Sequence, residues 1–405
     1  MNSKWPTRRL ADITLATETA TPQKRPNAEF DYIDVSSVSN TSFEITETQT
    51  LLGKHAPSRA RRRVNTNDVL FATIRPTLKR IAMIPAALHD AICSTGFIVL
   101  RANADLLPRF LFYFLQTAAF ISSVAALQKG ASYPAVTDGD VRNQAVPVPP
   151  LPEQRRIVAI LDEAFEGIAA AKANAEGNLQ KAKTACDAAT ASHLEHSTAD
   201  CPVQTVADLA QPHKGSIRTG PFGSQLLHSE FVDDGVAVLG IDNAVSNEFQ
   251  WGKRRFITPE KYRSLQRYTV KPGDVVITIM GTCGRCAVIP EDIPLSINSK
   301  HLCCISLDQR KCLPAFLHAY FLMHPSARRY LTEQASGSIM DGLNMGIIKE
   351  MPVQLPRIEV QKATVATLQG LQREASNAAR VFSAKATALD KLKASLLHQA
   401  FTGQL

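Results

Sequence analysis

The residues of this sequence best suited to bind a ligand form two basic runs. Residues 59–80 contain one acidic residue, Asp68, and residues 251–271 contain only Glu260. Such runs displace counterions from a polyanion, and arginine also donates two hydrogen bonds to guanine. A single basic run is usually only a solvated surface, but two of them favour nucleic-acid binding. The candidate DNA contacts are Arg59, Arg61, Arg62, Arg63, Arg75, Lys79 and Arg80 in the first run, and Lys253, Arg254, Arg255, Arg263 and Arg267 in the second.

A glycine-rich segment at residues 215–221 has the glycine spacing of a phosphate-binding loop. Pro221 stands where such a loop requires its lysine, which excludes nucleotide binding there. We expect residues 220–224 to form a tight loop that places polar side chains at the surface. The remaining candidate DNA contacts are loop residues: Ser132, Tyr133, Lys214, Arg218, Ser224 and Gln225.

The cysteines offer an alternative chemistry. Cys283 and Cys286, followed by the adjacent pair Cys303 and Cys304, have residue types that bind zinc. The pair interrupts an apolar stretch typical of a strand, so we expect buried thiols and no metal site. Cysteines used in this way are typical of a reducing compartment, and we expect a cytoplasmic protein. The sequence has neither a basic leader with an apolar core nor an apolar run of membrane-spanning length, so we expect no membrane partner.

Signatures of catalysis are not recognised in the sequence. We find no Asn-Pro-Pro-Tyr motif of adenine methylation, no Gly-x-Gly cofactor loop after a strand, no nuclease set of acids and lysine, and no Gly-x-Ser-x-Gly elbow. This favours a recognition protein that is not an enzyme. Two alternatives stay open, which are an autonomous DNA-modifying enzyme and a protein-interaction scaffold that does not contact DNA.

The elements that position these residues occur twice. Residues 61–82 match residues 267–288 at a constant offset, with Asp68 aligned to Asp274 in a turn that precedes an apolar strand. The two basic runs lie at comparable places in this repeat. The chain is too long for one ordinary core, and the duplication predicts two related α+β domains.

A proline cluster in each half precedes a long proline-free segment. The first cluster, residues 146–152, predicts a helix from about Glu153 to His196, which would be roughly 65 Å long at 1.5 Å per residue. Apolar residues repeat there at alternating spacings of 4 and 3, which predicts a coiled-coil seam. The seam residues are Ile157, Leu161, Ala164, Ile168, Ala171, Ala175, Ala182, Ala185 and Ala189 in the first helix, and Val365, Leu368, Ala375, Ala379, Phe382, Ala386, Leu389 and Leu396 in the second.

Each seam needs a partner, and the other seam of the same chain is the nearest one. We therefore expect a long antiparallel two-helix coiled coil between the two domains. The alternative is two long helices that each pack on their own domain. The predicted division is a first domain at residues 1–150, a central helix at 151–200, a second domain at 201–355 and a C-terminal helix at 356–405.

These features together resemble the specificity subunits of type I restriction-modification systems. The resemblance rests on residues 149–158 (PPLPEQRRIV), 219–226 (TGPFGSQL), 273–276 (GDVV) with 281–285 (GTCGR), and 400–405 (AFTGQL). It covers essentially the whole chain. The first half lacks the Gly-Pro-Phe-Gly-Ser segment, and the second helix begins with residues 356–361 (PRIEVQ) instead of a Pro-Glu-Gln start.

The resemblance implies two target-recognition domains in a pseudo-twofold arrangement. Each domain would read one half of a split double-stranded DNA site, and the helices would set the length of the unread spacer. It also implies two methyltransferase (modification) subunits docked on the helices, with restriction subunits that carry endonuclease and translocase activity. This chain would then bind no cofactor, because S-adenosylmethionine, ATP and magnesium would be bound by those partners.

Overall fold

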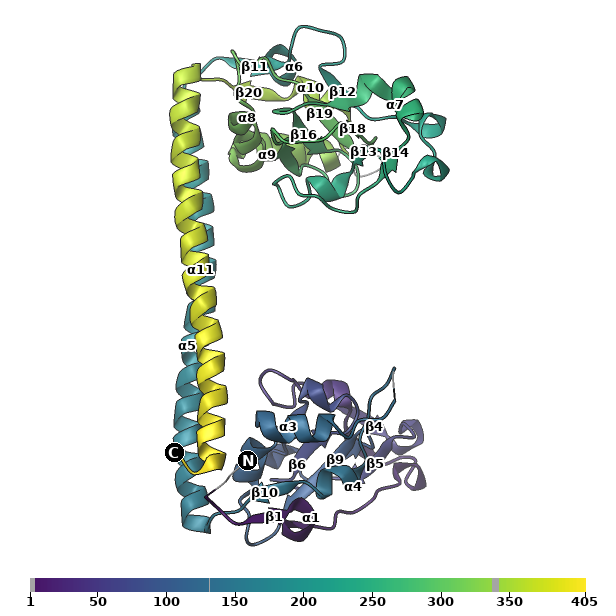
Figure 1. Cartoon of the computed structure of the whole chain (residues 1–405), viewed down its shortest axis with the longest axis vertical. Helices are drawn as coiled ribbons and strands as arrows, with labels where there is room; N and C mark the ends of the chain where they lie inside the picture. Colours follow the sequence, from purple (N-terminus) through teal and green to yellow (C-terminus); the bar gives the residue numbers. More distant parts are fainter. Residues whose placement is uncertain (1–3, 131, 337–341) are drawn as a thin grey trace. The chain divides into compact units, whose positions relative to one another are not determined.

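The computed structural model describes residues 4–130, 132–336 and 342–405, which fold into two compact units (Figure 1). Unit 1 consists of Met1–Glu176 and Phe382–Leu405, and unit 2 of Gly177–Val381. Both units contain part of each long helix, α5 (Leu151–Thr198) and α11 (Ile358–Thr402). The predicted α+β fold with two related domains and long helices is confirmed.

Unit 1 contains two four-stranded sheets with the strand orders β2-β9-β6-β7 and β4-β3-β8-β5, and a two-stranded sheet β1-β10. Its strands are β1 (Thr7–Arg9), β2 (Thr14–Leu15), β3 (Glu29–Ile33), β4 (Gln49–Leu52), β5 (Ala60–Arg63), β6 (Val69–Ala72), β7 (Ile81–Met83), β8 (Ile92–Ser94), β9 (Phe97–Ala102) and β10 (Ala145–Pro147). Its short helices are α1 (Leu10–Ile13), α2 (Pro108–Phe114), α3 (Ala118–Ala125) and α4 (Asp138–Arg142).

Unit 2 repeats this topology strand by strand, with the orders β12-β19-β16-β17, β14-β13-β18-β15 and β11-β20. Its strands are β11 (Val203–Thr205), β12 (Ile217–Thr219), β13 (Val236–Leu239), β14 (Phe256–Ile257), β15 (Thr269–Val270), β16 (Val275–Thr278), β17 (Cys286–Val288), β18 (Ser296–Asn298), β19 (Leu302–Ile305) and β20 (Pro352–Gln354). Its short helices are α6 (Val206–Leu209), α7 (Pro259–Leu265), α8 (Pro314–Met323), α9 (Pro325–Ser336) and α10 (Met345–Glu350).

The central strands β6 and β16 explain why both sequences read as uninterrupted apolar runs. In β6, Val69 and Phe71 pack in the cluster that contains the helices, whereas Leu70 packs in the cluster of the second sheet. A strand covered on both faces has no solvent side, so polar residues do not alternate along it. In unit 2, Val275 and Val276 divide between two clusters in the same way.

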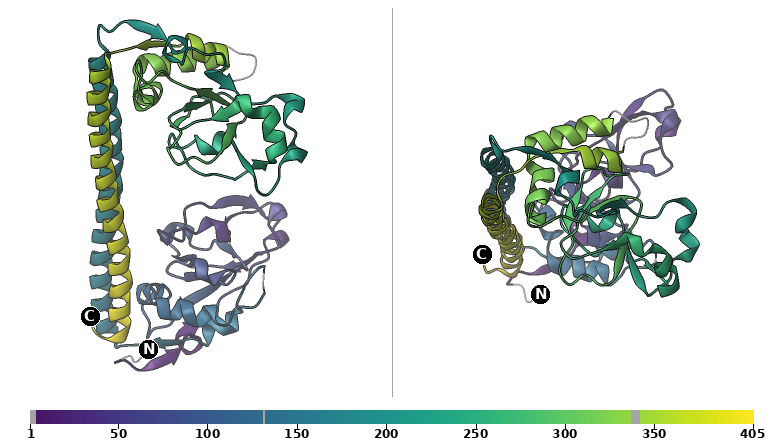
Figure 2. Two further views of the ribbon diagram at one scale, coloured as in Figure 1. Left: turned by 45° about the horizontal axis from the view of Figure 1, so that its top comes forward. Right: turned by 90° about the horizontal axis from the view of Figure 1, so that it is seen from above.

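The long helices α5 and α11 run antiparallel within each unit, where they lie side by side (Figures 1 and 2). In unit 1, Lys172 Nζ on α5 lies 2.7 Å from the Asp390 carboxylate on α11. In unit 2, Cys186 Sγ lies 3.6 Å from the carbonyl oxygen of Leu371. Helix α5 begins slightly earlier than predicted, with Pro152 in its first turn, where proline is tolerated. Within the described residues, no helix is long and apolar enough to span a bilayer.

The predicted seam is correct along α11 and wrong near the end of α5. Every predicted seam residue of α11 is buried or half-buried, but Ala185 and Ala189 of α5 are exposed. The seam passes instead through Leu179, Ala182 and Cys186, which are half-buried. A straight α-helix drifts by roughly 20° per heptad relative to a strict seven-residue repeat, so a 4-3 pattern extrapolated over several heptads leaves the contact face.

Each long helix is joined to its unit by a buried glutamine in its first turns. Gln154 accepts a hydrogen bond from the Leu107 amide at 2.8 Å and donates to the carbonyls of Asp105 and Pro149 at 2.8 and 2.9 Å. The side chain is fully buried. It therefore holds the start of α5 against the start of α2.

Gln361 repeats this arrangement in unit 2. It accepts from the Leu313 amide at 2.9 Å and donates to the carbonyls of Lys311 and Pro356, both at 2.9 Å. The different residues before Gln361 do not change this device, because its contacts are all to backbone atoms.

Residues 382–405 complete the core of unit 1. Phe401 is fully buried and packs against Phe110 and Phe114, with ring centroids 4.8 and 5.5 Å away. Gly403 then ends α11 in the left-handed conformation, at φ 79°. A β-carbon there would lie 2.7 Å from Lys4 Cβ. Both the backbone conformation and the lack of space therefore favour glycine at this position.

Candidate nucleic-acid interface

The exposed members of the first basic run come from β5 and from the loop between β6 and β7. Arg59 and Arg61 are exposed at β5. Arg63 forms an ion pair with Asp90 at 3.0 Å, but both side chains face solvent, where such a pair contributes little. Arg75 is exposed in the loop. These guanidinium groups remain available to a phosphate or a base edge.

Two other members of this run have structural roles, which corrects their assignment as DNA contacts. Arg62 forms a bidentate pair with Asp138, the first residue of α4, with Nη2 3.2 Å from Oδ1. Arg80 donates to the backbone carbonyls of Val35, Ser36 and Val38. The sequence does not reveal either partner. Asp138 lies 76 residues after Arg62 along the chain, and backbone carbonyls are present at every residue.

The loop between β6 and β7 holds two basic residues in a strained backbone conformation. Arg75 has φ 49° and Lys79 has φ 54°, both in the left-handed region. The same loop of unit 2 has glycines with positive φ, Gly281 at 73° and Gly284 at 77°. Glycine adopts this conformation without the steric cost that other residues incur. Unit 1 therefore keeps two cations at positions where the duplicated loop has glycine, and such strain is typical of functional sites.

Tyr133 lies beside this strained loop. The guanidinium of Arg75 lies 5.3 Å from the centroid of the Tyr133 ring, and Tyr133 is 73% exposed. Ser132 is also exposed. An exposed aromatic ring with a stacked arginine can stack on a base and contact a phosphate at once. The structure thus brings together three of the predicted residues.

The second basic run divides in a similar way. Lys253 and Arg254 are exposed, and the Arg254 guanidinium lies 5.2 Å from the centroid of the Trp251 ring. Arg255 pairs with Asp242 at 3.0 Å, with both side chains about one-third exposed. The side chain of Arg255 is therefore oriented by Asp242 of the same unit, whereas those of Lys253 and Arg254 are available to an external anion.

The two basic runs coincide in the duplicated fold only in part, which corrects the expectation of matching positions. Arg61 lies in β5 and Arg267 lies just before the equivalent strand β15, but residues 251–263 lie in the segment from before β14 to α7. Arg263 is exposed on α7, and the Arg267 guanidinium lies 4.8 Å from the centroid of the Tyr268 ring. The units therefore present different basic surfaces on the same scaffold.

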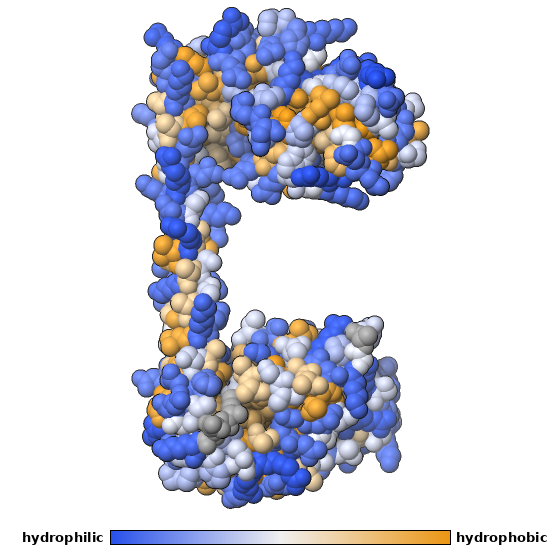
Figure 3. Space-filling model, in the orientation of Figure 1, coloured by the Kyte–Doolittle hydropathy of each residue, from blue (hydrophilic) through white to orange (hydrophobic). Residues whose placement is uncertain are grey.

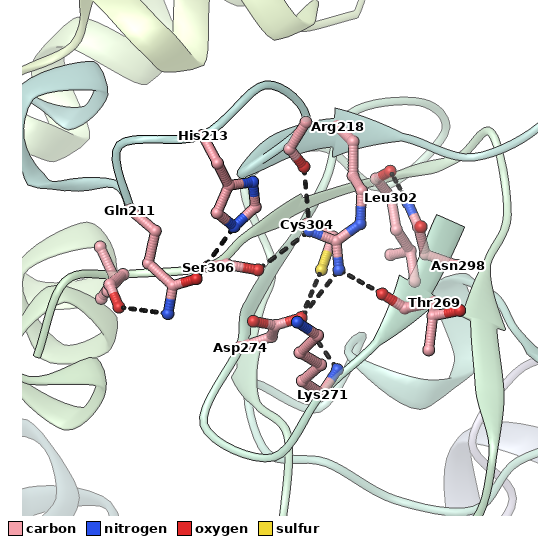
Figure 4. Close-up of polar contacts among 12 residues, drawn as sticks. Gln211, His213, Arg218, Thr269, Lys271, Asp274, Asn298, Leu302, Cys304 and Ser306 are labelled. Atoms are coloured by element: carbon pink, nitrogen blue, oxygen red, sulfur yellow. Dashed lines mark hydrogen bonds and ion pairs between the residues drawn. The ribbon is translucent and has the colours of Figure 1, made fainter. Parts of the chain in front are cut away.

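Arg218 lies inside unit 2, which corrects its assignment as a DNA contact (Figure 4). Only 9% of the residue is exposed, and its guanidinium pairs with the Asp274 carboxylate at 2.9 Å. It also donates to Ser306 Oγ at 2.9 Å and to the carbonyl of Thr269. These bonds fix β12 against β19 and the start of β15. Lys214, which precedes β12, is exposed.

Unit 1 builds the same buried pair with an arginine from a different strand. Asp68, the counterpart of Asp274, binds Arg101 of β9 with Nε 2.8 Å from Oδ1. In the register of the two sheets, Leu100 of β9 corresponds to Ile305 of β19, so the place of Arg101 is taken in unit 2 by Ser306, directly after β19. Arg218 of the neighbouring strand fills that place. A buried carboxylate without its cation is strongly destabilising, so each unit retains the pair.

Ser224 and Gln225 lie in an exposed loop after β12. Gln225 Oε1 accepts a hydrogen bond from the Tyr268 hydroxyl at 2.8 Å and a longer one from the Phe222 amide at 3.4 Å. Gln225 is therefore joined to Tyr268 and, through it, to Arg267. Sequence reasoning missed Phe222 and Tyr268, although an aromatic residue beside Gly-Pro and another beside an arginine were visible signals.

Of the cysteines that offered a metal site, Cys286, Cys303 and Cys304 are core residues of unit 2, and Cys283 is half-buried against that core. Cys303 and Cys304 are fully buried on opposite sides of β19, in separate apolar clusters. Burial raises the pKa of Cys303 to about 12, and burial near Asp274 also raises the pKa of Cys304. Thiols held neutral in this way are poor metal ligands. Within the described residues, no cluster of potential metal ligands is found.

The model of the type I restriction modification DNA specificity domain matches residues 2–176 and 240–380. The chain belongs to this family. Similar specificity subunits include that of the type I restriction enzyme EcoBI of Escherichia coli, 23% identical over 79% of this chain and 70% of the relative. That of MjaVIII of Methanocaldococcus jannaschii is 22% identical over 84% of this chain and 80% of the relative.

Solved structures of the specificity-subunit family share this fold. The HsdS subunit of Thermoanaerobacter tengcongensis is 27% identical, with a TM-score of 0.62 and coverage of 99% of this chain and 97% of that chain. A chain from a study of complex assembly and conformational transition in the type I R-M system is 29% identical, with a TM-score of 0.82 and coverage of 99% and 98%.

Proposed function

We propose that this chain is the DNA sequence-specificity subunit of a type I restriction-modification complex, and that each unit reads one half of a bipartite target. The observation that carries the proposal is the family match over both units. The repeated strand order, with differently placed free cations, supports two related readers with different targets. Phosphate contacts would supply most of the affinity, and base contacts the sequence preference.

The proposal includes partners that perform the chemistry. Two modification subunits would transfer methyl groups to adenine, and restriction subunits would translocate and cleave DNA. S-adenosylmethionine, ATP and magnesium would be bound by those subunits and not by this chain. The names of the related proteins, which are subunits of type I restriction enzymes, support this division of labour.

The phosphate and base contacts of unit 1 are assigned to Arg59, Arg61, Arg63, Arg75, Lys79 and the ring of Tyr133. Those of unit 2 are assigned to Lys253, Arg254, Arg263 and Arg267. Their side chains face solvent, and Arg75, Arg254 and Arg267 also stack on aromatic rings. Arg62, Arg80, Arg218 and Arg255 are left out because their guanidinium groups are used within the fold.

The experiment that tests the proposal is methylation mapping. The chain is co-expressed with its modification subunit in a host that lacks adenine methylation, and modified adenines are located by sequencing. We expect one motif of two short half-sites separated by a fixed spacer. The modification subunit without this chain is the control and should give no such motif. Methylation that is equally sequence-specific without this chain would refute the proposal.

A further inference from the structure

The loop at residues 220–225 of unit 2 presents an aromatic ring to solvent. Phe222 is 46% exposed. It lies between the buried Pro221 and the exposed Gly223. Figure 3 shows that apolar side chains reach the surface of unit 2 beside hydrophilic ones. An exposed phenylalanine on a flexible loop would have no defined orientation. Whether Phe222 can serve as a binding residue therefore depends on how the loop is held.

The first support of the loop is the close approach of two backbones. A β-carbon on Gly220 would lie 2.1 Å from the carbonyl oxygen of Asn298 and 2.3 Å from the carbonyl carbon of Ser299. These backbone atoms cannot yield in the way a flexible side chain can, so this position requires glycine. Gly223 then takes φ 55°, which turns the chain directly after Phe222. The backbone path on both sides of Phe222 thus depends on a glycine.

The second support is a hydrogen-bonded bracket. Gln225 Oε1 accepts from the Tyr268 hydroxyl at 2.8 Å and from the Phe222 amide at 3.4 Å. A glutamine that reads adenine uses its oxygen and its amide nitrogen together. Here the oxygen is occupied by the protein, so Gln225 is a positioning residue. It connects the loop to Tyr268, against which Arg267 stacks.

The third support is the buried ion pair at the base of the loop. β12 ends at Thr219, immediately before Gly220. Arg218 in this strand bonds to Asp274, Ser306 and the Thr269 carbonyl (Figure 4). The residue that leads into the loop is therefore tied to three other segments of the unit. A loop anchored in this way keeps its shape before a ligand arrives.

The charge around the loop selects the kind of ligand. No acidic residue occurs between Asp208 and Glu230 in the sequence. The Glu230 carboxylate is itself occupied, by Lys261 Nζ at 2.6 Å and by the Leu227 amide at 2.7 Å. Arg267 is exposed beside the bracket. The loop thus combines an apolar tip, Phe222, with a nearby cation, Arg267, and its own segment carries no free carboxylate. This combination suits a polyanion that also has apolar surfaces, such as the faces of nucleic-acid bases.

We propose that Phe222 is a preformed wedge that enters between stacked bases of the half-site read by unit 2. Phenylalanine side chains inserted at a base step unstack it, and DNA-binding proteins use such insertions to select deformable steps. Arg267 holds the adjacent phosphate. Phe222 thereby becomes a specificity-determining residue of unit 2. The inference rests on the function proposed above, because it requires that unit 2 binds duplex DNA.

The test uses the complex of the full chain with its modification subunits and a set of duplexes of the mapped target. In each duplex, 2-aminopurine replaces one purine of the unit 2 half-site, because its fluorescence rises when it is unstacked. We expect a rise at one position with the wild-type complex and no rise with Phe222→Ala. The affinity should fall roughly 5- to 150-fold, the range of base–aromatic stacking, with an unchanged salt slope because no charge is removed.

A matched control distinguishes the wedge from a general apolar surface. Leu227 is 49% exposed two residues after Gln225, yet it lies outside the bracketed loop. Leu227→Ala should therefore change neither the affinity nor the fluorescence. Phe222→Leu keeps an apolar wedge and should retain part of the fluorescence rise. The half-site of unit 1 should give the same fluorescence in all variants.

The outcomes separate the inference from the function on which it rests. If the wild-type complex binds no duplex, the proposed function fails. If it binds and Phe222→Ala binds equally well with the same fluorescence, only the wedge is refuted. The wedge is also refuted if Phe222→Ala lowers the salt slope, or if it prevents assembly with the modification subunits, because the ring then serves a phosphate site or a protein contact.

Discussion

At the scale of single residues, His324 shows how a buried ring can couple the stability of unit 2 to pH. It is 2% exposed and stacks on Tyr320, with ring centroids 4.2 Å apart. Its Nδ1 accepts from the Ser326 amide at 3.2 Å, at the start of α9. Its Nε2 lies 3.1 Å from Thr198 Oγ1, which donates to the Leu194 carbonyl. These partners require a neutral ring that carries its proton on Nε2.

Burial lowers the pKa of His324, and nearby Glu195 only partly opposes this effect. The unfolded chain therefore binds the proton more readily than the folded chain does. This contribution to stability is complete above about pH 6.5, the ordinary histidine value, and is lost as the pH falls below it, at up to about 1.4 kcal/mol per pH unit. Urea unfolding of wild type and His324→Asn between pH 5 and pH 8 measures the effect. A stability difference between them that does not change with pH would contradict it.

The residue scale also shows the limits of reading a site from sequence. Charge density in the sequence drew attention to Arg61, Arg75 and Arg254, whose side chains are exposed. It could not separate them from Arg62 or Arg218, because a carboxylate brought near by folding determines whether a guanidinium is free. Exposure of an arginine depends on tertiary contacts, whereas charge is a property of the residue itself.

At the scale of elements, the paired glutamines Gln154 and Gln361 decide where the long helices begin. Each makes three hydrogen bonds to backbone groups of its own unit and none to another side chain. Each therefore works with any neighbouring sequence that leaves the backbone in place. This explains how residues 356–361 form the same junction without a Pro-Glu-Gln start.

Gln154→Ala should destabilise unit 1 by about 1–3 kcal/mol, because it leaves an amide and two carbonyls buried without partners. Gln361→Ala should have the same effect on unit 2. Gln180→Ala is the matched control, since Gln180 is exposed on α5 and should change stability by at most about 0.5 kcal/mol. Urea unfolding with a probe in each unit checks the result. Equal stability of Gln154→Ala and Gln180→Ala would show that the buried amide has no such role.

The elements were more predictable than the site, for a physical reason. Proline clusters and apolar periodicity act through local chain geometry, so residues 146–152 and the seam of α11 fixed the helix positions well. The exposed Ala185 and Ala189 mark where local geometry was not enough. Which face of α5 contacts α11 depends on the rotation of the helix, which adds up over many residues. Because so many positions of α5 are alanine, the sequence does not show which of them face α11.

At the scale of the whole molecule, the proposed spacer function gives a prediction about length. Deleting one heptad from each long helix, residues 177–183 of α5 and 375–381 of α11, removes about 10 Å of helix, or roughly three base pairs of DNA. Seven residues are close to two helical turns, so the seams stay in register. Methylation mapping should show the same half-sites and a shorter spacer. Altered half-site sequences would contradict independent reading by the two units.

Unit 1 is assembled from two stretches of chain, and this determines the order in which the protein can be completed. During synthesis, Met1–Glu176 emerges first, but Phe382–Leu405, which carries Phe401 into the core of that unit, emerges only after all of unit 2. The part translated first is therefore the part that finishes folding last. Until then Phe110 and Phe114 lack their partner ring, so a nascent or prematurely terminated chain would expose an apolar surface that chaperones and proteases recognise.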